Sequence, residues 1–169
     1  MPVTNHYEVN INLGYYQFFF SDSKIDLRSV NPDCWREGDA SRTGVFTSPG
    51  IILYRAEDPS VAHLSIDILD LPPASCLLPP ASCLLPPAEE LKGRSKVIDA
   101  SIDIPTGELQ IDDFPFVQNH TKLIPVQPTC YRVRLSYTFS HNDLEEAFSL
   151  SIWQEAYSEV RVLLFNNIA

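Results

Sequence analysis

Acidic side chains in short-range pairs come nearest to a chemical site in this sequence. The pairs are Asp67 and Asp70, Asp99 and Asp103, and Asp112 and Asp113. Paired carboxylates can serve as a general acid and base, or they can bind calcium. Alternate residues of a strand share a face, so Asp99 and Asp103 are expected on the solvent face if the isoleucines around them point inward. We therefore favour a polar outer surface over a catalytic or calcium site.

The histidines and cysteines lack the spacing of a metal site. They are His6, His63, His120 and His141, and Cys34, Cys76, Cys83 and Cys130. No cysteine lies in a CxxC pair, and no Cys/His group has zinc-ligand spacing. The sequence also contains no Gly-rich phosphate loop, GxSxG motif or HExxH motif. We therefore predict no cofactor, no metal and no catalytic residue, and rank a hydrolase last among the possible functions.

Acidic residues are concentrated in two stretches, 97–121 and 135–160, that contain no Lys or Arg. If the fold brings these stretches together, they form one acidic face that attracts a basic partner. Chance clustering is the alternative. The candidate protein-binding residues are Asp99, Asp103, Glu108, Asp112, Asp113, Asp143, Glu145 and Glu146.

The overall charge limits the kinds of partner. With 22 acidic and 12 basic residues the formal net charge is −10, which disfavours nonspecific binding to nucleic acid or to an anionic membrane. The first residues do not resemble a secretory signal, and no apolar stretch approaches the ~20 residues of a membrane span. We therefore expect a cytoplasmic protein whose cysteines are reduced.

Alternation of apolar and polar residues predicts strands along most of the chain. It is clearest over Tyr131–Phe139 and Ile98–Ile104. Residues 6–20 are expected to form one bent strand or two strands, because the alternation changes phase after Gly14. Further strands are expected over 43–47, 50–56, 64–68, 108–111, 148–152 and 160–164. Polar connections are expected over 21–42, with a short helical turn near 33–37, and over 112–128.

These elements predict the fold class. About eight to ten strands joined by short turns indicate an all-β, antiparallel two-sheet β-sandwich with little helix, to which residues 143–147 could contribute one turn. A β-barrel is the alternative. The 169 residues are expected to form a single domain, 1–169, with its own core.

A tandem repeat interrupts the predicted strands. Residues 71–91 read LPPASCL twice and then LPPAEEL. Two prolines in each unit exclude a continuous helix. Exact repetition favours duplication inside a tolerant surface loop over a proline-rich docking segment, for which the PxxP spacing is absent. We predict a Pro-rich loop insertion at 71–91.

Several segments carry a family resemblance. They are LGYYQFFF at 13–20, TGVF at 43–46 before the strand at 51–54, the strand-turn-strand at 97–111 with IDIPTG at 102–107, and CYRVR at 130–134. In this order they resemble the competence protein J (ComJ-like) family over most of the chain. The repeats and the extra length at 22–42 depart from the family. The resemblance implies a small protein that blocks a basic, DNA-binding nuclease, and it carries over no inhibitory residue.

Two functions are consistent with these observations. The first is a non-enzymatic protein-binding module, a nuclease-inhibitor or immunity-like protein, which binds a basic protein such as a nuclease through an acidic face. The alternative is a ligand- or metal-binding β-sandwich domain that uses the loops at one end. The sequence leaves homo-oligomer formation open.

Overall fold

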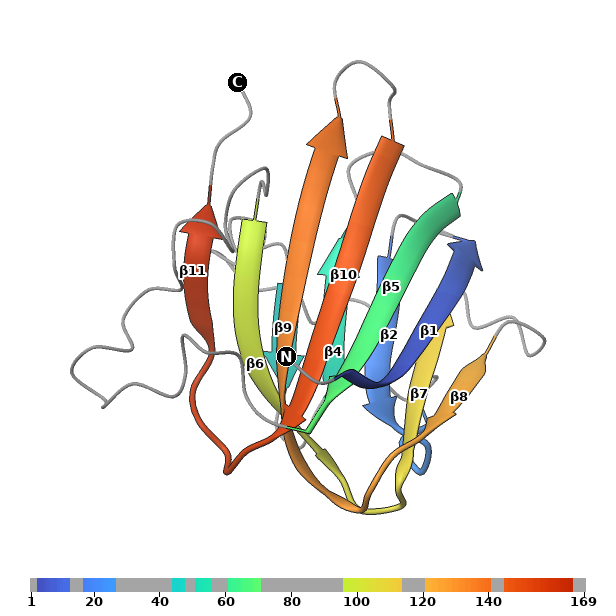
Figure 1. Ribbon diagram of the computed structural model, residues 1–169, viewed down its shortest axis with the longest axis vertical. Helices are drawn as coiled ribbons and strands as arrows, with labels where there is room; N and C mark the ends of the chain where they lie inside the picture. Colours follow the sequence, from blue (N-terminus) through green and yellow to red (C-terminus); the bar gives the residue numbers. More distant parts are fainter. Residues whose placement is uncertain are drawn as a thin grey trace.

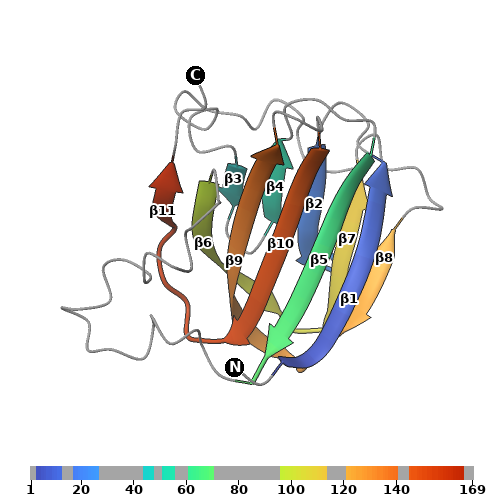
Figure 2. The same ribbon diagram turned by 45° about the horizontal axis from the view of Figure 1, so that its top comes forward.

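The computed structural model describes residues 3–12, 17–26, 44–47, 51–55, 61–70, 96–113, 121–140 and 145–165. These ranges contain eleven strands and no helix. The strands form two sheets that lie face to face (Figure 1) (Figure 2). The all-β, two-sheet sandwich predicted from the alternation is therefore confirmed, with one strand more than the upper expectation.

Six strands form the first sheet. In spatial order they are β1 (Val3–Asn12), β5 (Val61–Leu69), β10 (Glu145–Gln154), β9 (Thr129–Ser140), β6 (Lys96–Ile104) and β11 (Arg161–Phe165). Neighbours are antiparallel except β5 and β10, which run parallel with Phe148 opposite Leu64. The expectation of antiparallel pairing is therefore wrong for this one pair.

Five strands form the second sheet, and every neighbouring pair is antiparallel. In spatial order they are β3 (Gly44–Thr47), β4 (Ile51–Arg55), β2 (Gln17–Asp22), β7 (Glu108–Asp113) and β8 (Lys122–Pro125). Strands β1 and β2 thus belong to different sheets. Residues 6–20 were expected to form one bent strand or two strands, and the structure has two. The apolar residues before the phase change face the core from the six-stranded sheet, and those after it face the core from the five-stranded sheet.

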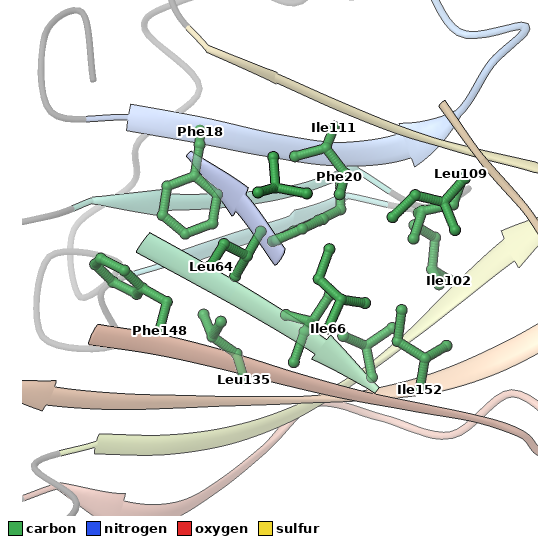
Figure 3. Close-up of a cluster of buried hydrophobic side chains, with 14 of the residues drawn as sticks. Phe18, Phe20, Leu64, Ile66, Ile102, Leu109, Ile111, Leu135, Phe148 and Ile152 are labelled. Carbon is green, nitrogen blue, oxygen red and sulfur yellow. The ribbon is translucent and has the colours of Figure 1, made fainter. Parts of the chain in front are cut away.

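The core lies between the inner faces of the two sheets (Figure 3). Phe18 of β2 is fully buried, and its ring meets the ring of Phe148 of β10 edge-on at 5.2 Å between centroids. Ile66 and Ile152 are also fully buried, from the parallel pair β5 and β10. Burying each such side chain contributes about 1.5–3 kcal/mol, so the alternating apolar residues are what hold the sheets together.

The sequence prediction missed strand β8, which lies within the polar connection expected over 112–128. This strand has four residues, and Ile124 is its one buried side chain. Pro125 lacks an N–H donor and is tolerated because β8 lies at the edge of its sheet. So short a strand gives almost no alternation to recognise.

Other expectations meet the structure only in part. Glu145–Ala147 belong to strand β10, so the helical turn expected near 143–147 is wrong for these residues. The turn near 33–37, the insertion at 71–91 and Asp143 lie outside the described residues. Within the described ranges no helix has the length and hydropathy of a membrane span.

Candidate protein-binding surface

One end of the sandwich, at the bottom of Figure 1, is built from strand ends and turns of both sheets. We call it the lower end. It comprises residues 22–26, 69–70, 103–108, 125–130 and 154–160, together with the start of β1. Because β5 and β10 are parallel, both strands finish here. Strand β6 also finishes here and turns directly into β7.

The exposed charges of the lower end are mostly negative. Among its described residues the exposed acidic side chains are Asp26, Asp70, Asp103, Glu108, Glu155 and Glu159, and the one exposed base is Lys24. Two of these carboxylates are held in place: Ser23 Oγ donates to Glu108 Oε2 at 3.0 Å, and Trp153 Nε1 donates to Glu155 Oε2 at 2.6 Å. Such a concentration of one sign of charge attracts a basic partner.

Buried Asp22 joins two turns of this surface. Its Oδ2 accepts hydrogen bonds from Thr106 N at 2.9 Å and from Thr106 Oγ1 at 2.6 Å, and its Oδ1 accepts one from Lys24 N at 2.9 Å. Burial raises the pKa of Asp22, but these hydrogen bonds outweigh burial and bring the pKa below its ordinary value. The ionised carboxylate therefore fixes the turn that carries Glu108.

Gly107 connects that turn to the segment after β8. Its φ of +75° lies in the left-handed region that favours glycine. Its carbonyl oxygen accepts a hydrogen bond from Val126 N at 2.9 Å. A Cβ atom on Gly107 would lie 2.9 Å from the carbonyl oxygen of Val126, closer than van der Waals contact allows. The Pro-Thr-Gly turn predicted from the sequence is thus also a packing contact.

Asp103 and Glu155 act together on Cys130. Burial raises the pKa of the Cys130 thiol, and the negative charges of Asp103 and Glu155 raise it further against the opposing effect of Arg132. A protonated thiol is a poor nucleophile, so this site is unsuited to cysteine chemistry. Cys130 is a free thiol, and the other three cysteines lie outside the described residues.

Two of the eight predicted binding residues, Asp103 and Glu108, lie exposed at the lower end. Asp99 does not, although it precedes Asp103 on the same strand. It is 5% exposed, and Arg134 of the neighbouring strand β9 donates to both its oxygens, from Nε at 2.8 Å and from Nη2 at 2.9 Å. The expectation that Asp99 faces solvent is therefore wrong, because an arginine directly opposite covers and neutralises it.

Asp112 is also buried, and its Oδ2 accepts a hydrogen bond from Thr121 Oγ1 at 2.7 Å. Glu145 and Glu146 begin β10 and Asp113 ends β7, so all three lie away from the lower end. The structure does not describe the side chains of these three residues. The predicted set is therefore divided between two ends and the interior.

Sequence reasoning left out several acids of the lower end. Asp26 and Asp70 lie outside the two acidic stretches, and Glu155 and Glu159 lie within the second stretch but were not selected. These four acids have one feature in common: each lies in a turn or beside the end of a strand. Loops at the same end of a sandwich meet in space regardless of their separation in sequence.

A pocket with a volume of about 480 Å³ opens at the lower end, between edge strands β1 and β8. Its described lining residues are Thr4, Asn5, Tyr7, Ile68, Leu69, Asp70, Pro125, Val126, Gln127, Tyr131 and Gln154. Tyr131 OH donates to the carbonyl oxygen of Gln127 at 2.8 Å, and burial raises the pKa of this phenol, which keeps it neutral. Polar and apolar residues contribute to the pocket lining in nearly equal shares.

A third group of polar residues lies on the outer face of the six-stranded sheet. His6 Nδ1 is 2.6 Å from Asp67 Oδ1, and its Nε2 is 2.8 Å from Glu8 Oε1. The hydrogen bonds with Asp67 and then with Glu8 raise the pKa of His6. Among the residues that the structure describes, no three His, Cys, Asp or Glu side chains are arranged to bind a metal ion.

Comparison with known proteins supports the fold. No protein-family model matches this chain, and no curated protein sequence does. Among solved structures, the chain is similar to ComJ of Bacillus subtilis, an inhibitor of the DNA-degrading activity of NucA, with a TM-score of 0.59 and 9% identity. This alignment covers 88% of this chain and 96% of ComJ. The chain is also similar to the protein of crocagin biosynthetic gene J, with a TM-score of 0.57, 14% identity and coverage of 90% and 100%. The resemblance to ComJ expected from the sequence is confirmed at the level of the fold.

Proposed function

We propose that this protein is a non-enzymatic binding module that inhibits a basic protein, such as a DNA-degrading nuclease, through its lower end. The observation that carries the proposal is the concentration of exposed acids there. A nuclease that holds DNA presents a basic surface to the phosphates, and carboxylates on a rigid scaffold can occupy the same surface. The fold shared with a nuclease inhibitor supports this choice among basic partners.

Asp103 and Glu108 are the proposed central contacts. Both are exposed and lie on either side of the turn at 105–107. That turn is held to β2 by Asp22 and to the segment after β8 by Gly107. A rigid arrangement lowers the conformational entropy lost when the partner binds. Asp113, Glu145 and Glu146, at the end of β7 and the start of β10, define the alternative location, at the other end of the molecule.

The test is inhibition of DNA degradation by NucA, the nuclease named for the structural neighbour, together with direct measurement of binding. The wild-type protein should inhibit, and affinity should fall as NaCl rises from about 0.05 to 0.3 M, because salt screens exposed charges. Asp103→Asn/Glu108→Gln should weaken binding by about three- to tenfold at low salt. The matched control Glu145→Gln/Glu146→Gln removes the same charge from the other end and should leave binding unchanged.

Three results would contradict the proposal. One is the absence of both binding and inhibition. Another is binding that is insensitive to salt, since the attraction is electrostatic. The third is a larger loss in the control variant than in Asp103→Asn/Glu108→Gln, which would move the contact surface to the other end.

The pocket between β1 and β8 favours a second candidate, a ligand-binding domain that uses its end loops. Its volume lies within the range of small-ligand sites, and its polar groups converge from four segments of the chain. Purification from native extract followed by mass spectrometry distinguishes the candidates. A stoichiometric small molecule with no protein partner would favour the second candidate over the first.

A further inference from the structure

Among the described residues that line the end pocket, Asp70 is the one with a formal charge. Asp70 is exposed, and the described lining residues include no Lys, Arg or His. Thr4 Oγ1 donates to Asp70 Oδ1 at 2.5 Å, which fixes the orientation of the carboxylate. Its second oxygen, Oδ2, accepts no hydrogen bond from the part of the chain that the structure describes. The pocket therefore offers an oriented negative acceptor to an incoming donor.

The other polar groups around Asp70 can also accept hydrogen bonds. Asn5, Gln127 and Gln154 line the same pocket and are exposed, and the side chain of Gln154 also forms a hydrogen bond with Tyr131. Each amide has a carbonyl oxygen with two lone pairs. A guanidinium has five N–H donors in a planar fork, and an ammonium has three, so either group can use several acceptors at once. The polar part of the pocket is therefore suited to a cation with several donors.

The remaining wall is apolar and firmly held. Tyr7, Ile68 and Val126 line the pocket, are half-buried and pack against the core of the sandwich. Such a surface can bury a methylene stem, and the face of Tyr7 can attract a cation. Because these side chains are part of the core packing, the pocket is formed before any ligand arrives. An apolar wall beside an anionic acceptor matches a cation carried on an aliphatic stem.

We propose that the end pocket binds a guanidinium or ammonium group on an apolar stem, with Asp70 as its counter-ion. The inference rests on the proposed function, because it identifies the group of the basic partner that the lower end recognises: an arginine or lysine side chain. A free alkylguanidine or alkylamine shares this chemistry.

The probe is butylguanidinium, followed by amide NMR of the isotope-labelled full-length protein. It should shift the amide signals of Asn5, Ile68, Val126 and Gln127 and leave the signals of β11 unchanged. The neutral analogue butylurea has the same stem and nearly the same shape, and it should bind at least about tenfold more weakly, since it lacks the charge-assisted hydrogen bonds. Equal binding of the two compounds, or shifts outside the pocket, would overturn the proposal.

Two variants locate the counter-ion. Asp70→Asn keeps the acceptor for Thr4 but removes the charge, and it should weaken butylguanidinium binding about tenfold or more. Asp103→Asn removes the same charge at the same end but outside the pocket lining, and it should change binding less than about twofold. Equal losses in the two variants would show a general effect of charge and would overturn the site. Gln154→Ala, which leaves every charge in place, should weaken binding by a smaller factor, and no loss in it would exclude the amide contacts.

Inhibition of DNA degradation by NucA distinguishes the two sources of the cation, a side chain of the partner and a free alkylguanidine or alkylamine. If Asp70→Asn weakens both butylguanidinium binding and nuclease inhibition, the pocket receives a side chain of the partner. If it weakens only butylguanidinium binding, the pocket takes a free alkylguanidine or alkylamine, and the assignment to the partner is overturned. If butylguanidinium binds without any inhibition of the nuclease, the proposed function fails alone. Inhibition without butylguanidinium binding would overturn the pocket site alone.

Discussion

Asp99 and Asp103 lie four residues apart on the same face of strand β6, and their surroundings differ completely. Asp99 is buried and receives two hydrogen bonds from Arg134, which itself is 8% exposed. Asp103 is exposed, near the end of the strand. Asp99 lies opposite Arg134 in the sheet, whereas Asp103 lies opposite Cys130. The neighbouring strand therefore decides which of two identical carboxylates is available to a partner.

This contrast extends to the rest of the molecule. On the outer sheet face, Asp99 and Arg134 form an ion pair that is removed from water, and the buried Arg132 donates to the carbonyl oxygens of Ser158 and Glu159 at 2.9 Å each. The lower end holds exposed acids on short turns. Buried pairs need their partners in place, while exposed acids contribute little to stability and can contact another protein.

The largest expected effect on the free energy of unfolding comes from breaking the buried ion pair between Asp99 and Arg134. Asp99→Asn should destabilise the protein by about 3–5 kcal/mol, because it removes the negative charge that accepts two hydrogen bonds from the buried Arg134 guanidinium. Asp103→Asn should change stability by less than about 0.5 kcal/mol. Urea denaturation monitored by circular dichroism measures both variants. Equal, small effects would remove the distinction between the two aspartates.

Asp22 should give the next largest effect, because it is a buried acid within the lower end. Asp22→Ala removes the acceptor of three hydrogen bonds and should cost about 2–3 kcal/mol at neutral pH. The pKa of Asp22 is lower in the folded than in the unfolded protein, so its stabilisation is present above the unfolded pKa and is lost as pH falls through the folded pKa. Denaturation at neutral and at acidic pH should show the variant and the wild type converging at low pH. A difference that is constant over this range would contradict the assignment.

Gly107 tests whether the turn between Asp103 and Glu108 is rigid. Gly107→Ala should cost about 1–2 kcal/mol, because an L-residue disfavours positive φ. Gly107→Asn tolerates positive φ better, but its Cβ atom still meets the carbonyl oxygen of Val126. Both variants should therefore lower the midpoint of thermal unfolding. Full recovery with Asn would show that the close contact is unimportant.

The smallest expected effect concerns the exposed contacts of His6 with Asp67 and Glu8. The hydrogen bond with Asp67 is the largest cause of its raised pKa, so Asp67→Asn should lower the pKa of His6 more than Glu8→Gln does. Any stabilisation from this pairing is present below the unfolded pKa and is lost as pH rises through the folded pKa. Titration of the His6 ring signals by NMR measures the shift. A pKa that is unchanged in Asp67→Asn would show that the pairing is absent in solution.

The sequence predicted the strands where alternation is long and regular, as in Ile98–Ile104 and Tyr131–Phe139. Ten of the eleven strands fall on expected segments, since one buried face imposes a period of two on the residues. Strand β8 was missed because a four-residue edge strand buries one side chain. The parallel pairing of β5 and β10 was also missed, because alternation is the same for either direction.

The exposure of the candidate binding residues was predicted less well. Charge counts along the chain selected Asp103 and Glu108 correctly as exposed acids, but they also selected Asp99 and Asp112. An acid with an arginine or threonine opposite it looks the same in sequence as an acid that faces solvent. Asp70 contributes to the pocket only because the end of β5 lies beside the start of β1. These distinctions depend on register between strands, which one sequence does not specify.

The central claim is that exposed acids of the lower end serve binding while buried acids hold the fold. It is tested most directly by measuring, on Asp103→Asn/Glu108→Gln, both the free energy of unfolding and the affinity for a basic nuclease. We predict stability within about 1 kcal/mol of the wild type and affinity reduced by about three- to tenfold at low salt. Unchanged affinity, or a loss of affinity that merely follows a loss of stability, would contradict the claim.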